Sequence, residues 1–405
     1  MLVVKKFGGS SVADKERIFN VARRCIEDYK AGNQVVVVLS AMGKTTDGLL
    51  AKAADINPNA SKREMDMLLT TGEQISVALM AMAMDSLGVP AISLNAFQVQ
   101  MHTTTNYSNS RLLRIDSERI MHELESRKIV IVTGFQGIDK YDNYTTLGRG
   151  GSDTTAVALA AALHADACEI YTDVDGVYTS DPRIVPNARK LAEITYDEML
   201  ELASLGAKVL HNRSVEMAKR YGVQLVVRSS LNHEEGTIVK ENAKMEGMLI
   251  SGVAADKNVA RISVVGVKNE PGVAFKVFNV LSAKNISVDI ILQSIGRGDK
   301  KDISFTVART DLKDAVAVLE EARGNKFECE AIDYEEHVAK VSIVGAGMES
   351  NAGVAAKMFE ALYNANINIR MIDQGSSELN IIIAVDEADY TPAIRSLYHA
   401  VERMM

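Results

Sequence analysis

The chain has 405 residues, of which 47% are hydrophobic and 24% charged, and it carries a net charge of -8. Since a domain averages roughly 150 residues, this length predicts two or three domains. The negative charge argues against a general binder of nucleic acid or anionic membranes, which needs a basic surface. We find no signal-peptide pattern and no unbroken apolar run near the roughly 18 residues of a membrane span.

Cysteine and histidine usage predicts a cytoplasmic protein without a dedicated transition-metal site. Cys25, Cys168 and Cys329 are isolated in the sequence and form no CxxC pair, so we expect reduced thiols. The seven histidines form neither an HxxxH pattern nor a cluster with cysteine.

The first expected strand ends in a glycine pair, in the sequence KKFGGSS. Lys6 comes just before Gly8 and Gly9, and Ser11 with Asp14 fits a capping box for the next helix. Main-chain N–H groups at a helix N-terminus can bind phosphate, with a lysine to neutralise its charge. A tight turn and a capped helix explain the same residues without a ligand, and the Walker A pattern is absent. The segment alone therefore fits both a phosphate site and a plain turn.

Up to about residue 231, short apolar runs alternate with helical patterns, which predicts an α/β sandwich. The apolar runs predict strands buried on both faces, as in a parallel sheet, and they lie at 34–40, 129–134, 169–174 and 223–229. Helical patterns cover 14–30, about 62–87 and the residues from Ser152 onward.

The expected helix over 62–87 contains Gly72 and Glu73 in the middle of an otherwise apolar pattern. A carboxylate beside a helix-weakening glycine is out of place there unless it meets a partner. A buried ion pair and an ammonium-bearing ligand both satisfy this requirement.

A second glycine pair, Gly150-Gly151, lies between Arg149 and a predicted Ala-rich helix that begins with Ser152-Asp153. Either Ser152 or Asp153 can cap that helix without any ligand. A guanidinium beside two glycines at a helix N-terminus is also a good clamp for a carboxylate or a phosphate.

The sequence YTDVDGVYTSDPRI follows a predicted buried strand. Its Asp173, Asp175 and Asp181 fit turn chemistry. The carboxyl ends of strands are, however, the places where α/β sheets hold their ligands. Turn residues and ligand contacts therefore both remain open for this loop.

From about residue 258 the sequence contains an internal repeat. Residues 272–288 match residues 353–369 with an offset of 81, and eight of the 17 positions are identical. Each copy predicts strand, glycine turn, helix, two strands and helix, which is a ferredoxin-like βαββαβ unit. We therefore expect a large domain over 1–235, a polar linker over 236–257, and two small domains over 258–338 and 339–405.

Seven motifs in chain order resemble the aspartate kinases of the amino-acid kinase family. They are KFGGSS at 6–11, LSAMGKTTDGLL at 39–50, TTGE at 70–73, GFQG at 134–137, LGRGGSDTTA at 147–156, YTDVDGVYTSDPRIVP at 171–186 and GAKVLH at 206–211. The repeats resemble the paired ACT domains that follow the kinase domain in this family. The resemblance implies a three-layer sandwich with a mostly parallel central sheet, followed by two ACT domains.

The resemblance also implies an activity and a set of site residues. ATP with Mg²⁺ would phosphorylate L-aspartate to 4-phospho-L-aspartate, the first step toward lysine, threonine, methionine and diaminopimelate, with Mg²⁺ carried by ATP. Lys6 and Asp153 would be catalytic, with Asp153 orienting Lys6. ATP would contact Lys6, Phe7, Gly8, Gly9, Ser10, Thr172, Asp173, Tyr178, Arg183 and Lys208. Aspartate would contact Ser40, Thr46, Glu73, Arg149, Gly150, Gly151 and Ser152, with Glu73 at the ammonium and Arg149 at a carboxylate.

Paired ACT domains typically bind feedback amino acids where two chains associate, which implies a homo-oligomer and inhibition by lysine, threonine or both. The implied effector contacts are Asn269, Gly272, Ala274, Gln293, Asn368 and Ile369. Met245 and Met248 precede the repeats, so an internal start that yields a separate ACT-only subunit is compatible with the sequence.

Three other functions compete with this interpretation. Another member of the amino-acid kinase family, such as glutamate 5-kinase or a UMP kinase, is disfavoured by the Gly72-Glu73 pair, Arg149 and the tandem repeats. A bifunctional aspartate kinase–homoserine dehydrogenase needs a longer chain and a GxGxxG motif after the repeats. A non-catalytic amino-acid sensor built on ACT domains needs decayed kinase motifs, whereas Lys6 and Asp153 are present.

Overall fold

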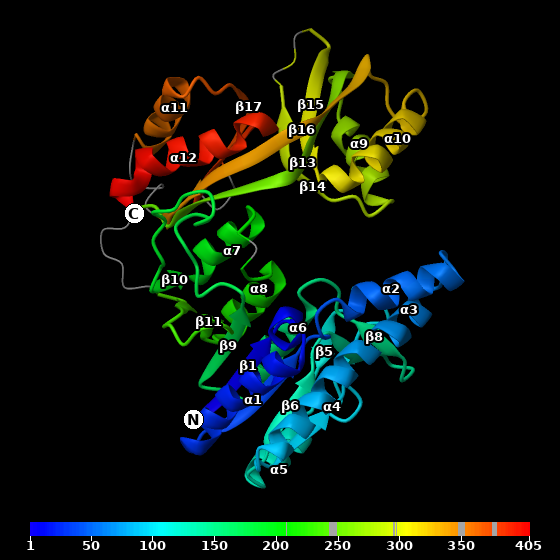
Figure 1. The fold of residues 1–405 in the computed structure, drawn as a ribbon. Coiled ribbons are helices and arrows are strands. Elements are labelled where there is room, and N and C mark those ends of the chain that lie inside the picture. Colours follow the sequence, from blue (N-terminus) through cyan, green and yellow to red (C-terminus); the bar gives the residue numbers. More distant parts are fainter. Residues whose placement is uncertain (208, 243–248, 295, 297, 347–352, 375–378) are drawn as a thin grey trace. The chain divides into compact units, whose positions relative to one another are not determined.

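A computed structural model describes the chain except for residues 208, 243–248, 295, 297, 347–352 and 375–378. It divides into two compact units, which we treat separately (Figure 1). The N-terminal unit comprises Met1–Tyr178, Lys190–Ser204 and Lys208–Met245. The C-terminal unit comprises Thr179–Arg189, Leu205–Ala207 and Glu246–Met405.

The N-terminal unit is built on a mostly parallel sheet, as the apolar runs predict. In spatial order its strands are β10 (Glu193–Thr195), β12 (Thr237–Lys240), β11 (Leu225–Ser229), β9 (Ala167–Thr172), β1 (Leu2–Phe7), β2 (Gln34–Leu39), β6 (Ile129–Thr133) and β3 (Ala91–Leu94). All neighbouring strands are parallel except β11 and β12. The carboxyl ends of β1, β2, β6 and β9 therefore meet at one edge of the sheet.

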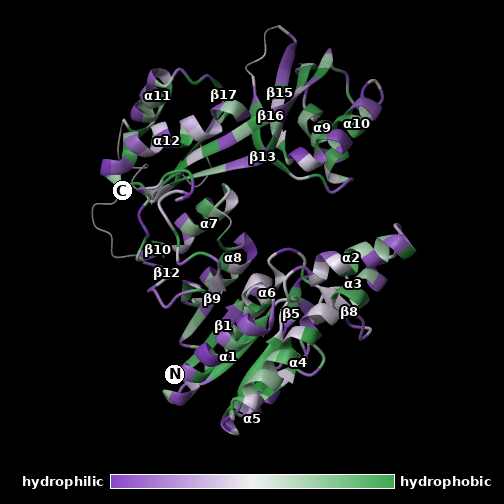
Figure 2. Ribbon diagram, viewed as in Figure 1, coloured by the Kyte–Doolittle hydropathy of each residue, from purple (hydrophilic) through white to green (hydrophobic). Residues whose placement is uncertain are grey.

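Helices cover both faces of this sheet. On one face α1 (Lys15–Lys30) packs against α4 (Thr71–Ser86) and the sheet, and on the other lies α6 (Gly151–Ala162). Figure 2 shows α4 as largely hydrophobic, in keeping with its buried Val77, Met80 and Met84. The other helices are η1 (Gly9–Val12), α2 (Thr45–Ile56), α3 (Lys62–Leu69), α5 (Glu118–Glu125), α7 (Tyr196–Ser204) and α8 (Asn212–Tyr221). A second, smaller sheet contains β5 (Leu112–Arg114), β4 (His102–Thr103), β7 (Gln136–Ile138) and β8 (Tyr144–Thr146) in that order.

The helix expected over 62–87 is divided at Thr70 into α3 and α4. At this junction Gln136 Nε2 donates a hydrogen bond of 2.5 Å to the Thr70 carbonyl oxygen. Glu73 therefore lies in the first turn of α4 and not in the middle of a helix, and the helix dipole favours a carboxylate at that end. The combined stretch Lys62–Ser86 is long enough to cross a membrane and contains an 18-residue window with a mean hydropathy of 1.3, but 44% of that window is buried within the fold.

The expected capping box at the start of α1 is wrong in its cap residue. Asp14 is the N-cap, and its side chain accepts a hydrogen bond from Arg17 N at 2.9 Å. Ser11 is buried one turn earlier in η1, and its hydroxyl donates to Ser230 Oγ at 2.8 Å. A short 3₁₀ turn therefore separates the glycine pair from the helix, which sequence periodicity does not indicate.

The C-terminal unit contains one antiparallel sheet shared by both repeats. Its strand order is β14 (Val288–Gln293), β15 (Lys300–Val307), β13 (Gly252–Lys268), β16 (Ala331–Val344), β18 (Asn380–Asp386) and β17 (Ile369–Asp373). The helices are α9 (Val273–Ser282), η2 (Arg309–Asp311), α10 (Leu312–Ala322), α11 (Val354–Asn364), η4 (Glu387–Asp389), α12 (Tyr390–Val401) and η5 (Glu402–Met404). The order of elements is the repeated β-α-β-β-α pattern that the sequence predicts.

The long strands β13 and β16 join the two repeats. Residues 252–256 of β13 pair with residues 340–344 of β16, and the rest of β13 pairs with β15 and the first half of β16. The sequence assigns 236–257 to a linker, whereas this range includes β12 and the start of β13. β12 has only four residues, and its buried positions alternate with half-buried ones, so it carries little apolar pattern and the sequence suggests a linker there.

Thr179–Arg189 belongs to the C-terminal unit although it follows β9 closely in sequence. Val185 is buried in the core formed by α11, α12 and the facing strands. Thr179 shares a hydrogen bond of 3.0 Å with the Tyr398 hydroxyl, and Arg395 donates to Ile184 O at 3.0 Å. The sequence gives no indication of this assignment, because the segment continues a motif of the first domain.

Candidate active site

Lys6 and Asp153 form an ion pair at the carboxyl end of β1, with 2.6 Å between Lys6 Nζ and Asp153 Oδ1. Asp153 lies in the first turn of α6. Successive side chains of a strand alternate between faces, so the adjacent Lys5 points the other way and pairs with Glu169 at 2.6 Å. The Lys6 and Asp153 side chains remain 12% and 14% exposed, so a ligand can reach the amino group.

The glycine pair after β1 packs tightly against the loop after β2. A Cβ on Gly9 would lie only 2.5 Å from Ala41 O, so this position has no room for a side chain and requires glycine. Gly43 N donates a hydrogen bond to Gly9 O at 3.0 Å. A Cβ on Gly8 would lie 3.7 Å from Lys6 Nζ, so the lysine amino group sits beside this turn. The turn thus presents main chain next to a cation, which is the composition of a phosphate site.

Phe7 is fully buried and stacks on Tyr171, with 4.4 Å between the ring centroids. Only its main chain is therefore available for the ATP contact that the resemblance implies. Ser10 is exposed on the same turn, and Arg17 donates to its carbonyl oxygen.

Glu73 is a buried carboxylate with one unpartnered oxygen. Its Oε1 accepts a hydrogen bond from Ala41 N at 3.0 Å, the side chain is 4% exposed, and Oε2 has no hydrogen-bond partner among the described residues. Burial raises the pKa of Glu73 to about 7, although the hydrogen bond from Ala41 opposes the rise. In the described part of the chain no lysine or arginine pairs with it, so a ligand ammonium is the partner that fits.

Ser152 lies where β6 and α6 meet. A Cβ on Gly134 would lie 2.5 Å from Ser152 Oγ and 3.0 Å from Leu39 O, so the GFQG motif supplies space for this serine. Ser40 follows β2, and its main-chain N–H donates to Phe7 O at 3.2 Å. Thr46 lies in the first turn of α2, after the same loop.

Arg149 is exposed on a turn made of glycines. Gly148 and Gly150 adopt φ angles of +77° and +67°, and Gly151 N donates to Gly148 O at 3.0 Å. Gly150 is the N-cap of α6, so Ser152 and Asp153 lie in the first turn instead of capping it. The capping role that the sequence allows for these two residues is therefore wrong.

We expect Gly150→Ala to destabilise the fold more than Gly222→Ala does. Both glycines have left-handed φ angles, of +67° and +66°, but a Cβ on Gly150 would overlap the His211 ring, whereas nothing lies within 4 Å of one on Gly222. Each alanine costs about 1 kcal/mol for its backbone conformation, and the overlap at Gly150 adds about 1–3 kcal/mol. Thermal unfolding of both variants measures the difference, and equal losses would contradict the packing of His211 on this turn.

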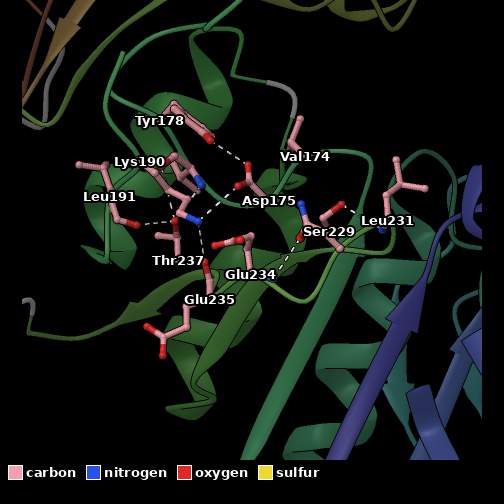
Figure 3. A network of polar contacts seen from close by, with 12 residues as sticks. Val174, Asp175, Tyr178, Lys190, Leu191, Ser229, Leu231, Glu234, Glu235 and Thr237 are labelled. Atoms are coloured by element: carbon pink, nitrogen blue, oxygen red, sulfur yellow. Dashed lines mark hydrogen bonds and ion pairs between the residues drawn. The ribbon is translucent and has the colours of Figure 1, made fainter. Parts of the chain in front are cut away.

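The loop after β9 is held in place by ionic and hydrogen bonds (Figure 3). The Tyr178 hydroxyl donates to Asp175 Oδ1 at 2.9 Å, and Lys190 Nζ lies 3.3 Å from Asp175 Oδ2. Lys190 also donates to Glu235 O at 2.8 Å. Asp175 therefore has a structural role in ordering this loop, which agrees with its interpretation as a turn residue.

The other residues that we expect to contact ATP lie in different parts of the structure. Thr172 ends β9, and Asp173 is exposed directly after it. Arg183 belongs to the C-terminal unit, where it forms an ion pair with Asp181 at 2.8 Å. Lys208 lies outside the described residues.

Sequence reasoning missed two groups that the structure places at this site. Ala41 supplies the N–H that holds Glu73, and His211 packs against Gly150. Both residues lie inside two of the seven motifs, LSAMGKTTDGLL and GAKVLH. Their position in these motifs was the sequence feature that could have indicated a place at the site. The order of residues in the sequence does not reveal that the Ala41 N–H binds Glu73 or that the His211 ring packs against Gly150.

The expected effector residues fall in the two halves of the C-terminal unit, one group in each repeat. Asn269 follows β13, Gly272 is the N-cap of α9 with Ala274 in its first turn, and Gln293 ends edge strand β14. Asn368 and Ile369 lie at the start of β17, the opposite edge strand. The order of the sheet therefore separates the two groups within one chain.

Comparisons with known proteins identify the family of the chain. The model of the amino acid kinase family matches residues 1–229, and the ACT domain model matches residues 262–322 and 341–401. An aspartokinase from Bacillus sp. (strain MGA3) is 51% identical over 402 residues, covering 99% of this chain and 97% of that protein. The chain belongs to the aspartokinases of the amino acid kinase family. An aspartokinase from Helicobacter pylori (strain J99) is 48% identical, with full coverage of both chains.

A solved structure agrees with this membership. E. coli aspartokinase III, in complex with aspartate and ADP, matches with a TM-score of 0.81 and 26% identity, covering 99% of this chain and 100% of that one. The resemblance, the α/β architecture and the ACT domains expected from the sequence are thereby confirmed.

Proposed function

We propose that this chain transfers the γ-phosphoryl group of ATP to the side-chain carboxylate of L-aspartate and yields 4-phospho-L-aspartate. The ion pair between Lys6 and Asp153 beside the glycine turn is the observation that carries the proposal. The aspartokinase relatives support it, as does the match to a kinase bound to aspartate and ADP. The product enters the biosynthesis of lysine, threonine, methionine and diaminopimelate.

The reaction needs alignment and charge neutralisation more than proton transfer. The side-chain carboxylate of aspartate is ionised at neutral pH, so the nucleophile requires no general base. Lys6 would neutralise charge on the phosphoryl oxygens, and Asp153 would hold its amino group in place. Mg²⁺ would arrive on the phosphates of ATP.

Glu73 and Arg149 would bind the two ends of the substrate backbone. The unpartnered Oε2 of Glu73 would accept the α-ammonium, and Arg149 would pair with a carboxylate. Ser40, Thr46, Gly150, Gly151 and Ser152 would complete the aspartate pocket. ATP would lie along Lys6, Phe7, Gly8, Gly9, Ser10, Thr172, Asp173, Tyr178, Arg183 and Lys208.

Trapping of the acyl phosphate tests this function directly. The protein is incubated with Mg·ATP, hydroxylamine and either L-aspartate or L-glutamate, and the hydroxamate is assayed. We expect aspartyl hydroxamate and no glutamyl hydroxamate. Signal with glutamate alone would assign the chain to the glutamate 5-kinase alternative. No hydroxamate with either amino acid from a protein that binds ATP would favour a non-catalytic sensor.

The ACT domains are proposed to bind feedback amino acids between two chains. Gln293 and Ile369 lie on opposite edge strands of one sheet, so a pocket that uses both needs a second copy. We therefore propose a homodimer at least, with the effector contacts Asn269, Gly272, Ala274, Gln293, Asn368 and Ile369. A separate ACT-only subunit that starts at Met245 or Met248 remains part of this proposal, and both methionines lie outside the described residues.

Domain borders at 235, 257 and 338 also remain a proposal. The borders after 257 and 338 divide β13 and β16. Reduced Cys25, Cys168 and Cys329 and the use of ATP support a cytoplasmic location.

A substitution at the proposed effector site should remove inhibition without loss of activity. We expect Gln293→Ala to raise the lysine or threonine concentration for half-inhibition at least about tenfold, because coupling between sites is worth about 1–3 kcal/mol. Lys326→Ala, which removes another exposed side chain of the same unit, serves as control. Full-length protein is used, since truncation near residue 250 would also remove Arg395 and Tyr398, which hold Thr179–Arg189. Unchanged inhibition in Gln293→Ala would contradict this effector contact.

A further inference from the structure

The turn that carries Arg149 is intrinsically adaptable. Three of the four residues at 148–151 are glycines, and glycine restricts the backbone least. A guanidinium on such a turn loses conformational freedom when it binds a carboxylate, which weakens binding. Whatever immobilises the turn in advance therefore sets the affinity for the substrate.

Asp66 holds one side of this turn. Its carboxylate is fully buried and accepts hydrogen bonds from Thr146 N at 2.8 Å and Thr146 Oγ1 at 2.9 Å. It also accepts one from Ser108 N at 2.9 Å. Asp66 thus ties α3 both to the end of β8, two residues before Gly148, and to the neighbouring segment 108–110.

Segment 108–110 packs against the glycine turn at 148–151 and against the end of β8. Ser110 N donates to Thr146 O at 2.9 Å, and Ser108 O lies 3.0 Å from the position of a Cβ on Gly148. The turn therefore has close main-chain contact with this segment, so displacement of one displaces the other.

Arg213 holds the same two segments from a different element. It is the second residue of α8, and its guanidinium donates to Leu147 O at 2.8 Å and to Ser110 O at 2.7 Å. Both acceptors are main-chain carbonyls, so this arginine joins two backbone segments. A planar guanidinium can bridge two acceptors in a fixed geometry, which a lysine ammonium cannot.

We propose that Asp66 and Arg213 are positioning residues that together fix the Arg149 turn in the geometry that binds the substrate carboxylate. This inference rests on the proposed role of Arg149. Neither residue has a hydrogen bond or ion pair to Lys6, Asp153 or the loop after β9 among the described residues, so we expect the larger effect on the binding of aspartate and not on the binding of ATP.

Steady-state kinetics of Arg213→Lys and Asp66→Asn test the proposal. We expect the KM for aspartate to rise at least about tenfold, with kcat and the KM for ATP changed by less than about threefold, as for loss of uniform substrate binding. Arg220→Met on the exposed side of α8 and Asp85→Asn in α4 are matched controls and should leave all three constants unchanged. An unchanged KM for aspartate in Arg213→Lys, the milder variant, would overturn the proposal.

A double-mutant cycle separates positioning from general loss of structure. If Arg213 acts through Arg149, then Arg213→Lys should raise the KM for aspartate by less than about twofold in an Arg149→Ala background. A full tenfold rise in that background would overturn the proposal, because the effect would not pass through Arg149. A normal KM for aspartate in Arg149→Ala alone would instead reject the proposed role of Arg149 itself.

Discussion

Replacing Lys6 with alanine should lower kcat at least about 10²-fold, the scale of removing one preorganised electrostatic contact from a transition state. The Lys6 amino group lies 2.6 Å from Asp153 and beside the Gly8 turn, where it can follow charge on the transferred phosphoryl group. Initial rates at saturating aspartate and Mg·ATP measure the loss.

A matched control distinguishes this local effect from a change in net charge. Lys15→Ala removes an equal charge from the exposed first turn of α1 and should retain wild-type kcat. Lys5 is unsuitable as a control, because its buried pairing with Glu169 would be broken and the fold destabilised. Near-normal turnover in a folded Lys6→Ala protein would contradict the assignment of Lys6 as catalytic.

Binding of aspartate should weaken as the pH falls through about 7. Burial raises the pKa of Glu73 to about 7, so its neutral form dominates below that pH. Only the ionised form can pair with the substrate ammonium, and kcat/KM for aspartate reports ionisation in the free enzyme. The value of kcat/KM should therefore fall by about tenfold per pH unit below pH 7, and rise to a plateau above it.

Glu73→Gln should abolish this acid limb and lower kcat/KM for aspartate by at least about 10²-fold. The amide has nearly the same shape but no charge, so the substrate ammonium would be left in a buried position without a counter-ion. Glu125→Gln, which changes an exposed carboxylate of the same unit, should keep both the limb and the activity. If the limb persists in Glu73→Gln, another group causes it, and Glu73 is not the ammonium contact.

Local patterns were sufficient for five strands of the parallel sheet, β1, β2, β6, β9 and β11, and for the order of elements in the repeats, but they did not indicate β3, β10, β12 or the smaller sheet. The run VVVVL at 35–39 is apolar throughout, and the structure buries it on both faces of a mostly parallel sheet. The 81-residue repeat likewise predicted the two ACT units, because a repeated amphipathic pattern produces a repeated fold. The predictions of where helices begin and end were less accurate, as the division at Thr70 and the cap at Asp14 show, because a helix end depends on single contacts.

The residues of the candidate site likewise divide into those that the sequence indicated and those that it did not. Lys6, Arg149 and the glycine pairs could be singled out in the sequence, because a cation close to a glycine pair at the start of a helix fits an anion site as well as a plain turn. The partner of Glu73 could not, since an alanine N–H leaves no chemical signature in a sequence. Asp66 and Arg213 were missed for a related reason, because their acceptors and donors are mostly main-chain groups of distant segments.

The sequence by itself indicated the family, through seven motifs in chain order that resemble the aspartate kinases, and it supplied the charged residues available for chemistry. It also indicated the longer helices and the buried strands, because these depend on short-range periodicity. The resemblance already implied that Asp153 orients Lys6, whereas only the tertiary structure decided that Glu73 keeps an oxygen without a partner among the described residues, and that Thr179–Arg189 belongs to the C-terminal unit. These features arise from contacts between residues far apart in the chain. The packing of whole elements brings such residues together, and no local pattern encodes that packing.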